Sequence, residues 1–174
     1  IEAIRKLRAE GVEIEADFIG DGPEADEIRN LAQDLTTAGC ARFHGWLPRH
    51  EIPNFLSLAH FIILPTACSE GWPKVLSEGM AYGAIPIATA LSAIPHYLVT
   101  KENGWLLERP SVLEVTTGIN WFLTNPGYWN YCQINALSLA TQFTYDHYLN
   151  KVLESIKLGK SGPQSQLAGP AEFI

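Results

Sequence analysis

The sequence has few cysteines and no long apolar run. Its three cysteines, Cys40, Cys68 and Cys132, are odd in number and lack the spacing of a metal or disulfide motif. This excludes a disulfide-built secreted scaffold and predicts a reduced, cytoplasmic setting. No apolar stretch within these residues reaches the length of a membrane span, and no signal peptide is visible.

Positive charge is also scarce. Twelve Lys and Arg residues face 19 Asp and Glu residues, for a formal net charge of -7. This balance argues against binding of nucleic acid or of an anionic membrane surface by this domain. The 174 residues, 47% hydrophobic and 18% charged, are enough for one globular core.

Methionine is the rarest residue, since Met80 is the only one and the chain begins at Ile1. We therefore expect the sequence to be part of a longer protein. Residues 158–174 are rich in Gly, Pro, Ser and Gln, which predicts a disordered tail after a domain of residues 1–157. Whether the tail is native to the protein is left open.

Short apolar segments alternate with helical patterns along the chain. The predicted strands are residues 13–20, 41–45, 61–65, 85–89 and 104–108. The predicted helices are residues 1–10, 23–37, 48–58, 73–83, 91–99, 111–124 and 126–141, with a last one from Tyr145. Such alternation indicates βαβ units and an α/β fold with a parallel sheet.

The segment "GDGPEA", from Gly20 to Ala25, follows a predicted strand and opens a predicted helix. It fits a loose dinucleotide fingerprint, but that site also needs an acid at the end of the next strand, which here ends in His44-Gly45. Dinucleotide binding is therefore disfavoured. A tight turn that needs glycine explains the segment, and a phosphate at the helix start stays open.

The segment "SEGWPKVLSEGMAYGAIPIAT", residues 69–89, carries the strongest candidate site. Glu70 follows a buried parallel strand, at the sheet edge where open α/β sheets bind ligands. Gly71 relaxes the turn and Pro73 suits the first turn of the next helix. The unpaired amides there, which can hold a phosphate, are those of Lys74, Val75 and Leu76.

Glu78 lies four residues after Lys74 on the same helix face. Amides and a lysine suit a phosphate, whereas carboxylates accept hydrogen bonds from vicinal hydroxyls, so the set suits a nucleotide sugar. The alternative is that Glu70 caps the helix and Glu78 pairs with Lys74. On the residues alone the two interpretations weigh about equally.

Other catalytic classes find no support. The five histidines show no ligand spacing, which predicts no metal site, and no cofactor is implied. Ser69 and Ser77 lack the setting of a nucleophile elbow.

Several segments together resemble the carboxy-terminal domain of GT-B glycosyltransferases of family 4, the "glycosyl transferases group 1" type. They are "FIGDGPE", "ARFHGWLPRHEIPNFLSLAHFIILPT", the segment of residues 69–89, "NGWLL" and "QFTYDHYLNKVLESI". The likeness runs from about Glu13 to Ile156. It lies in five loose motifs that follow one another with the right gaps.

The resemblance implies retaining transfer of a sugar from a nucleoside diphosphate donor. It makes Glu70 the catalytic residue at the donor sugar, while Glu78 binds the ribose. It places the turn from Gly71 to Val75 at the sugar and phosphates, Gly20 at the diphosphate, and the segment from His44 to Leu47 near the base. The implied donor-binding residues are thus Glu78, Gly71, Trp72, Pro73, Lys74, Val75, Leu76, Gly20, His44, Gly45 and Leu47.

The chain also departs from the family. The family domain begins with a strand and a loop whose Arg and Lys neutralise the diphosphate, and this chain starts after them. We therefore expect a Rossmann-like, doubly wound parallel sheet without its first, central strand, with extra helices at the carboxyl end. The strands at 13–19 and 61–65 would flank a gap or close it by pairing.

The expected partners are a nucleoside diphosphate sugar and an absent amino-terminal acceptor-binding domain, through which the protein could reach the inner membrane. The chain alone is expected to transfer no sugar. Two alternatives stay open: a sugar-nucleotide epimerase of GT-B architecture, and a non-catalytic domain that binds nucleotide sugars.

Overall fold

The computed structural model describes residues 1–69 and 71–160, with side chains up to Lys157. The chain forms two compact units, one of residues 1–141 and one that begins at Gln142. The first unit contains all the described strands, whereas the predicted domain ran on to residue 157.

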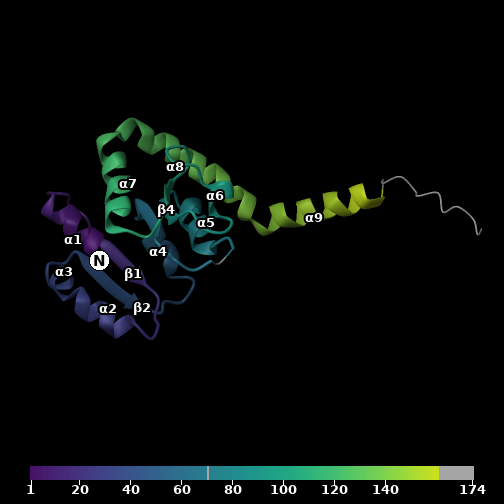
Figure 1. Ribbon diagram of the computed structural model, residues 1–174. Helices are drawn as coiled ribbons and strands as arrows, with labels where there is room; N and C mark the ends of the chain where they lie inside the picture. Colours follow the sequence, from purple (N-terminus) through teal and green to yellow (C-terminus); the bar gives the residue numbers. More distant parts are fainter. Residues whose placement is uncertain (70, 161–174) are drawn as a thin grey trace, which may run out of the picture. The chain divides into compact units, whose positions relative to one another are not determined.

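Five strands form two parallel sheets in the first unit (Figure 1). One sheet pairs β1 with β2, and the other has the order β3-β4-β5. The strands are β1 (Ala16–Ile19), β2 (Ala41–Gly45), β3 (Phe61–Leu64), β4 (Ile85–Thr89) and β5 (Trp105–Leu107). All lie where the apolar segments predicted them. In the described part of the chain, no hydrogen-bonded ladder joins β1 to β3, so the sheet is split between these two strands. This is the first of the two expected arrangements, in which the strands at 13–19 and 61–65 flank a gap.

Helices alternate with these strands and continue after them. They are α1 (Glu2–Ala9), α2 (Ala25–Leu31), α3 (Gln33–Thr37), α4 (Ile52–Leu56), α5 (Lys74–Ala81), α6 (Ile94–Tyr97), α7 (Val112–Thr124), α8 (Pro126–Ala140) and α9 (Tyr145–Lys160), with a 3-10 turn at Thr141–Phe143. The predictions for 48–58 and 91–99 were too long. The Asn103 side chain explains the second case, because its amide donates to the Tyr97 carbonyl oxygen over 3.0 Å and its oxygen accepts the Val99 N–H over 2.8 Å.

Helix α1 connects the two sheets. Leu7 packs with residues of the three-stranded sheet and of α7, namely Ile87, Leu107, Val115 and Ile119. Ile4, one turn earlier, packs with Leu35 and Ala41 beside the two-stranded sheet. Apolar residues three positions apart lie on one face of an amphipathic helix, so Ile4 and Leu7 can each pack against a different sheet. Packing against α1 thus joins the sheets without direct strand pairing.

Helix α8 lies at the amino edge of the larger sheet. The Gln133 side-chain amide donates to the Gly83 carbonyl oxygen over 2.9 Å, just before β4. The Asn135 amide donates to the Glu102 carbonyl oxygen over 3.0 Å, just before β5. Because α8 takes the amino edge, the carboxyl edge of this sheet is left to the connecting loops. That is the edge where the sequence predicts the site.

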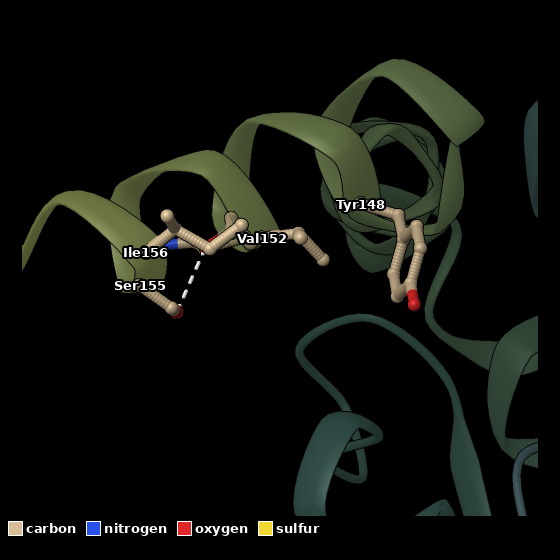
Figure 2. Close-up of a pocket in the computed structure, with 5 residues that line it drawn as sticks. Tyr148, Val152, Ser155 and Ile156 are labelled. Atoms are coloured by element: carbon tan, nitrogen blue, oxygen red, sulfur yellow. Dashed lines mark hydrogen bonds between the residues drawn. The ribbon is translucent and has the colours of Figure 1, made fainter. Parts of the chain in front are cut away.

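Helix α9 belongs to the second unit and has one apolar stripe. Its exposed apolar side chains are spaced three and four residues apart, at Tyr145, Tyr148, Leu149, Val152, Leu153 and Ile156. Figure 2 shows a hollow along this helix, lined by Tyr148, Lys151, Val152, Ser155 and Ile156. The helix runs three residues past the predicted tail boundary, and the rest of the predicted tail lies outside the described residues. Within the described residues, no helix combines the length and apolarity needed to cross a membrane.

Candidate functional site

Three glycines with positive φ lie at the end of β2, directly after β1 and in the loop after β3. They are Gly20 at φ +130°, Gly45 at φ +64° and Gly71 at φ +68°. A side chain is strained in this region, so glycine is required for the turns. All three were predicted as site residues. The carboxyl edge of parallel strands is where ligands bind in open α/β sheets.

The end of β1 borders an open cavity of about 420 Å³. It is lined by Phe18, Ile19, Gly20, Asp21, Gly22, Pro23, Glu24, Ala25, Ile28, Arg29 and Phe43. The "GDGPEA" segment is a tight turn, in which the Ala25 N–H donates to the Gly22 carbonyl oxygen over 3.0 Å. The turn and the cavity together place Gly20 beside a space that a ligand could enter.

The His44 side chain is fixed by two neighbours. Its Nε2 lies 2.7 Å from Asp17 Oδ1, and its ring centroid lies 4.5 Å from that of Phe55. Asp17 also accepts from Arg42 Nε over 2.8 Å. Arg42 first, and then His44, hold the pKa of the Asp17 carboxyl below its usual value, so the carboxylate is charged at neutral pH.

The segment after His44 continues with Trp46 and Leu47. Leu47 is half-buried. Trp46, which the sequence analysis did not single out, is 76% exposed. A single exposed aromatic side chain is common on protein surfaces, so Trp46 alone does not mark a binding surface.

The loop between β3 and α5 is held against the segment around α6. The Gly71 carbonyl oxygen accepts the Ala93 N–H over 3.4 Å, and the Trp72 ring packs edge-on against Tyr97 with centroids 5.1 Å apart. Glu70, the predicted catalytic residue, lies outside the described residues. Its neighbours on either side place the loop at the carboxyl edge of the sheet.

The start of α5 differs from the prediction in two details. Pro73 is buried and extended, and it precedes the first helical residue, Lys74, instead of lying in the first turn. Leu76 is fully buried, and its N–H donates to the Pro73 carbonyl oxygen over 3.1 Å. The expectation that the Leu76 amide is open to a ligand is therefore wrong. Lys74 and Val75 are exposed.

Glu78 lies in α5, as predicted, and is exposed. At 100° per residue it falls on the side of the helix opposite to the buried Leu76 and Met80. Within the described residues Lys74 and Glu78 form no ion pair, which leaves the carboxylate without the partner that the alternative interpretation gave it. A cleft shared with Glu70 stays a prediction.

Among residues 1–69 and 71–160, no three His, Cys, Asp or Glu side chains are grouped to hold a metal ion. The three cysteines are free, with Cys68 exposed and the other two buried.

Comparison with known families decides the assignment. The profile of the family "Glycosyl transferases group 1" matches residues 1–138. The chain belongs to this family. It is 32% identical over 112 residues to a protein named as a colanic acid biosynthesis glycosyltransferase, WcaL of Salmonella typhimurium, covering 62% of this chain and 28% of that protein. It is 31% identical over 111 residues to the amylovoran biosynthesis glycosyltransferase AmsK of Erwinia amylovora, covering 61% and 27%.

Solved structures show the same fold as this group 1 chain. HepE of Anabaena, solved with UDP, superimposes with a TM-score of 0.74 at 20% identity, over 90% of this chain and 44% of HepE. The catalytic domain of cholesterol-alpha-glucosyltransferase from Helicobacter pylori gives 0.69 at 21% identity, over 82% of this chain and 87% of that domain. The fold is therefore the Rossmann-like α/β fold of GT-B glycosyltransferases. The chain spans less than a third of the two curated relatives named above.

Proposed function

We propose that this chain is the donor-binding part of a retaining glycosyltransferase that takes a hexosyl group from a nucleoside diphosphate sugar. The observation that carries the proposal is the Glu-x7-Glu segment, which runs from the loop after β3 to Glu78, an exposed residue in the middle of α5. HepE, which shares the fold, was solved with UDP and with UDP-glucose, and this supports the same ligand class.

The residues of this edge have distinct roles in the proposal. Glu70 contacts the donor sugar, and Glu78 accepts a hydrogen bond from the ribose. The amides of Lys74 and Val75 and the turn at Gly71 face the sugar and phosphates. At the other strand ends, Gly20 faces the diphosphate, and the segment from His44 to Leu47 lies near the base.

The reaction explains why carboxylates suit this place. The bond between the anomeric carbon and the diphosphate oxygen breaks, and a bond from the same face forms to the oxygen of the acceptor hydroxyl, whose proton passes to the leaving diphosphate. Positive charge develops on the sugar as the bond breaks, and negative charge on the diphosphate. A carboxylate that holds the sugar hydroxyls, and amides and cations near the diphosphate, stabilise these charges where they arise.

The acceptor is proposed to bind a second domain. Support comes from coverage, because the chain spans only 28% of WcaL and 44% of HepE. In this proposal the enzyme works in the cytoplasm, and the second domain gives it access to the inner membrane.

The test measures, by ligand-observed NMR, whether nucleoside diphosphates and their sugar conjugates bind to the intact protein. UDP, GDP and ADP are compared with their free nucleosides. Binding of one diphosphate, and its competition by the matching sugar conjugate, supports the proposal. A folded protein that binds none of them contradicts it.

A further inference from the structure

We infer that Tyr97, on α6, is a positioning residue for the loop between β3 and α5. This loop carries Glu70, the catalytic residue of the proposed function, and the inference rests on that function. The contact that carries it joins the ring of Tyr97 to the ring of Trp72, which follows closely after Glu70 in the chain. In this role Tyr97 acts through the loop and not by contact with the substrate.

Few side chains of the loop are packed. Those described on either side of position 70 are exposed, namely Ala67, Cys68, Ser69 and Gly71. Trp72 is half-buried, and its ring lies edge-on to Tyr97, with centroids 5.1 Å apart and ring planes inclined by 65°. This is a favourable geometry for an aromatic pair. Trp72 is therefore the first packed side chain after position 70, and Tyr97 is a residue that it packs against.

The backbone of the loop is held by the same segment. The Ala93 N–H, just before α6, donates to the Gly71 carbonyl oxygen over 3.4 Å. Ser92 has φ +51°, in the left-handed region that residues other than glycine adopt at a cost. Such a conformation persists only where the surrounding structure fixes it. The segment from Ser92 to Tyr97 thus holds both a backbone group and a side chain of the loop, directly after position 70.

Helix α6 is the fixed partner in this contact. Ile94 and Leu98, which lie before and after Tyr97 in the chain, are buried in the core. The Asn103 side-chain amide donates to the Tyr97 carbonyl oxygen over 3.0 Å, which fastens the end of the helix. A residue on a loop is held precisely only where the side chains that support it are themselves fixed by packing and hydrogen bonds. Tyr97 meets this condition.

The position of the loop matters because of the chemistry proposed for Glu70. Its contact with the donor sugar strengthens as positive charge develops on the sugar. A displaced loop should therefore lower kcat more than it lowers donor affinity. A tyrosine that served only the stability of the fold would lower the free energy of unfolding without this difference between kcat and donor affinity. The difference separates positioning from packing.

The experiment compares Tyr97→Ala, Tyr97→Phe and Tyr82→Ala in the intact protein. Tyr82 is the matched control, because it is an exposed tyrosine at the end of α5 that lies away from the loop. Hydrogen exchange of the Ala93 amide reports on the contact without any substrate. Tyr97→Ala should speed this exchange roughly two- to tenfold and lower kcat about tenfold or more, with a smaller change in donor KM. Tyr97→Phe keeps the ring and should restore both values towards those of the wild type.

A second variant keeps the inference testable if thermal melting shows that Tyr97→Ala unfolds. Trp72→Leu removes the other ring of the pair and should speed the same exchange by a similar factor. An exchange rate in Trp72→Leu that stays at the wild-type value would overturn the inference.

The outcomes also separate this inference from the proposed function. If the wild type turns over no nucleoside diphosphate sugar, the proposed function fails. If it does, and Tyr97→Ala matches Tyr82→Ala in exchange or in kcat, the proposed function stands and the role of Tyr97 is overturned. The role is overturned as well if Tyr97→Phe behaves like Tyr97→Ala, since the ring would then not carry the contact.

Discussion

The backbone N–H of Gly20 donates to the carbonyl oxygen of Gly45 over 2.8 Å. This bond fastens the end of β1 to the end of β2, next to a register shift between Phe18 and Ile19. Both glycines have positive φ, so the backbone turns away from the sheet at the same place after each of the two strands. Gly20, at this junction, also lines the cavity at the end of β1.

The two glutamates of the 69–89 segment should differ in effect. In the intact enzyme, Glu70→Gln should lower kcat by about a hundredfold or more, since its sugar contact strengthens in the transition state. Glu78→Gln should mainly weaken donor binding, by about tenfold, because a ribose contact is alike in ground and transition states. Steady-state kinetics and titration with the nucleoside diphosphate separate these effects. Small, equal effects of both changes would instead favour the alternative in which Glu70 caps the helix and Glu78 is an ordinary surface carboxylate.

A steric prediction concerns Gly104, which precedes β5. A Cβ there would stand 2.7 Å from the Pro86 carbonyl oxygen, which belongs to the backbone and cannot rotate away. Gly104→Ala should therefore lower the free energy of unfolding by about 1–3 kcal/mol. Gly127, in α8, is the matched control, because a Cβ there meets nothing within 4 Å. Gly127→Ala should leave stability unchanged or raise it by up to about 1 kcal/mol. Urea denaturation measures both, and equal effects would contradict the steric account.

A pH prediction concerns Asp34. Arg5 on α1 donates to its carboxylate over 2.9 Å and 2.7 Å, which lowers the pKa of Asp34 from 3.8 to about 2. A carboxyl whose pKa is depressed on folding binds protons more readily in the unfolded state. Its stabilising contribution is therefore fully present above about pH 4 and is lost as the pH falls through about 2.

Asp34→Asn removes that contribution. The variant should be less stable than the wild type at pH 6, and the difference should shrink steadily as the pH falls from about 4 to about 2. Urea midpoints measured between these pH values provide the test. A difference that stays constant over the whole range would show that Asp34 acts by packing and not by its charge.

A labelling prediction concerns Cys68, in the loop that leads to Glu70. Cys68 is exposed, whereas Cys40 and Cys132 are buried, and burial also raises the pKa of the Cys132 thiol. Only the thiolate reacts, so a thiol reagent should modify Cys68 alone in the folded protein and all three after unfolding. If the loop binds the donor, a nucleoside diphosphate sugar should slow this modification. Unchanged rates at saturating ligand would argue against donor contact at this loop.

Local sequence patterns determined the strands and the long helices. "FIILP" and "IPIAT" are apolar and β-branched, and they form β3 and β4. Every residue of β4 is buried, whereas β3, which the sequence predicted to be buried, has only half-buried residues and an exposed Ile63. The pattern of turns and Pro73 placed the start of α5 to within one residue, and its end to within two. Burial drives these elements, and the period of apolar residues records burial directly. The predicted carboxyl end of the helix at 91–99 was wrong because the Asn103 side chain, which lies beyond the helix, bonds the backbone groups of Tyr97 and Val99.

The tertiary structure decided what lies together in the site. The sequence identified the glycines and acids by their order, but it gave no sign that Arg29 reaches Gly45, sixteen positions along the chain. It offered the amide of Leu76 as a ligand contact, whereas packing buries that residue completely. Contacts between side chains of different elements depend on how the helices pack against the sheets. Local sequence patterns do not determine this packing. The sequence by itself therefore determined the family, the strands and the segment that carries Glu78, while only packing decided which charges face the cavity.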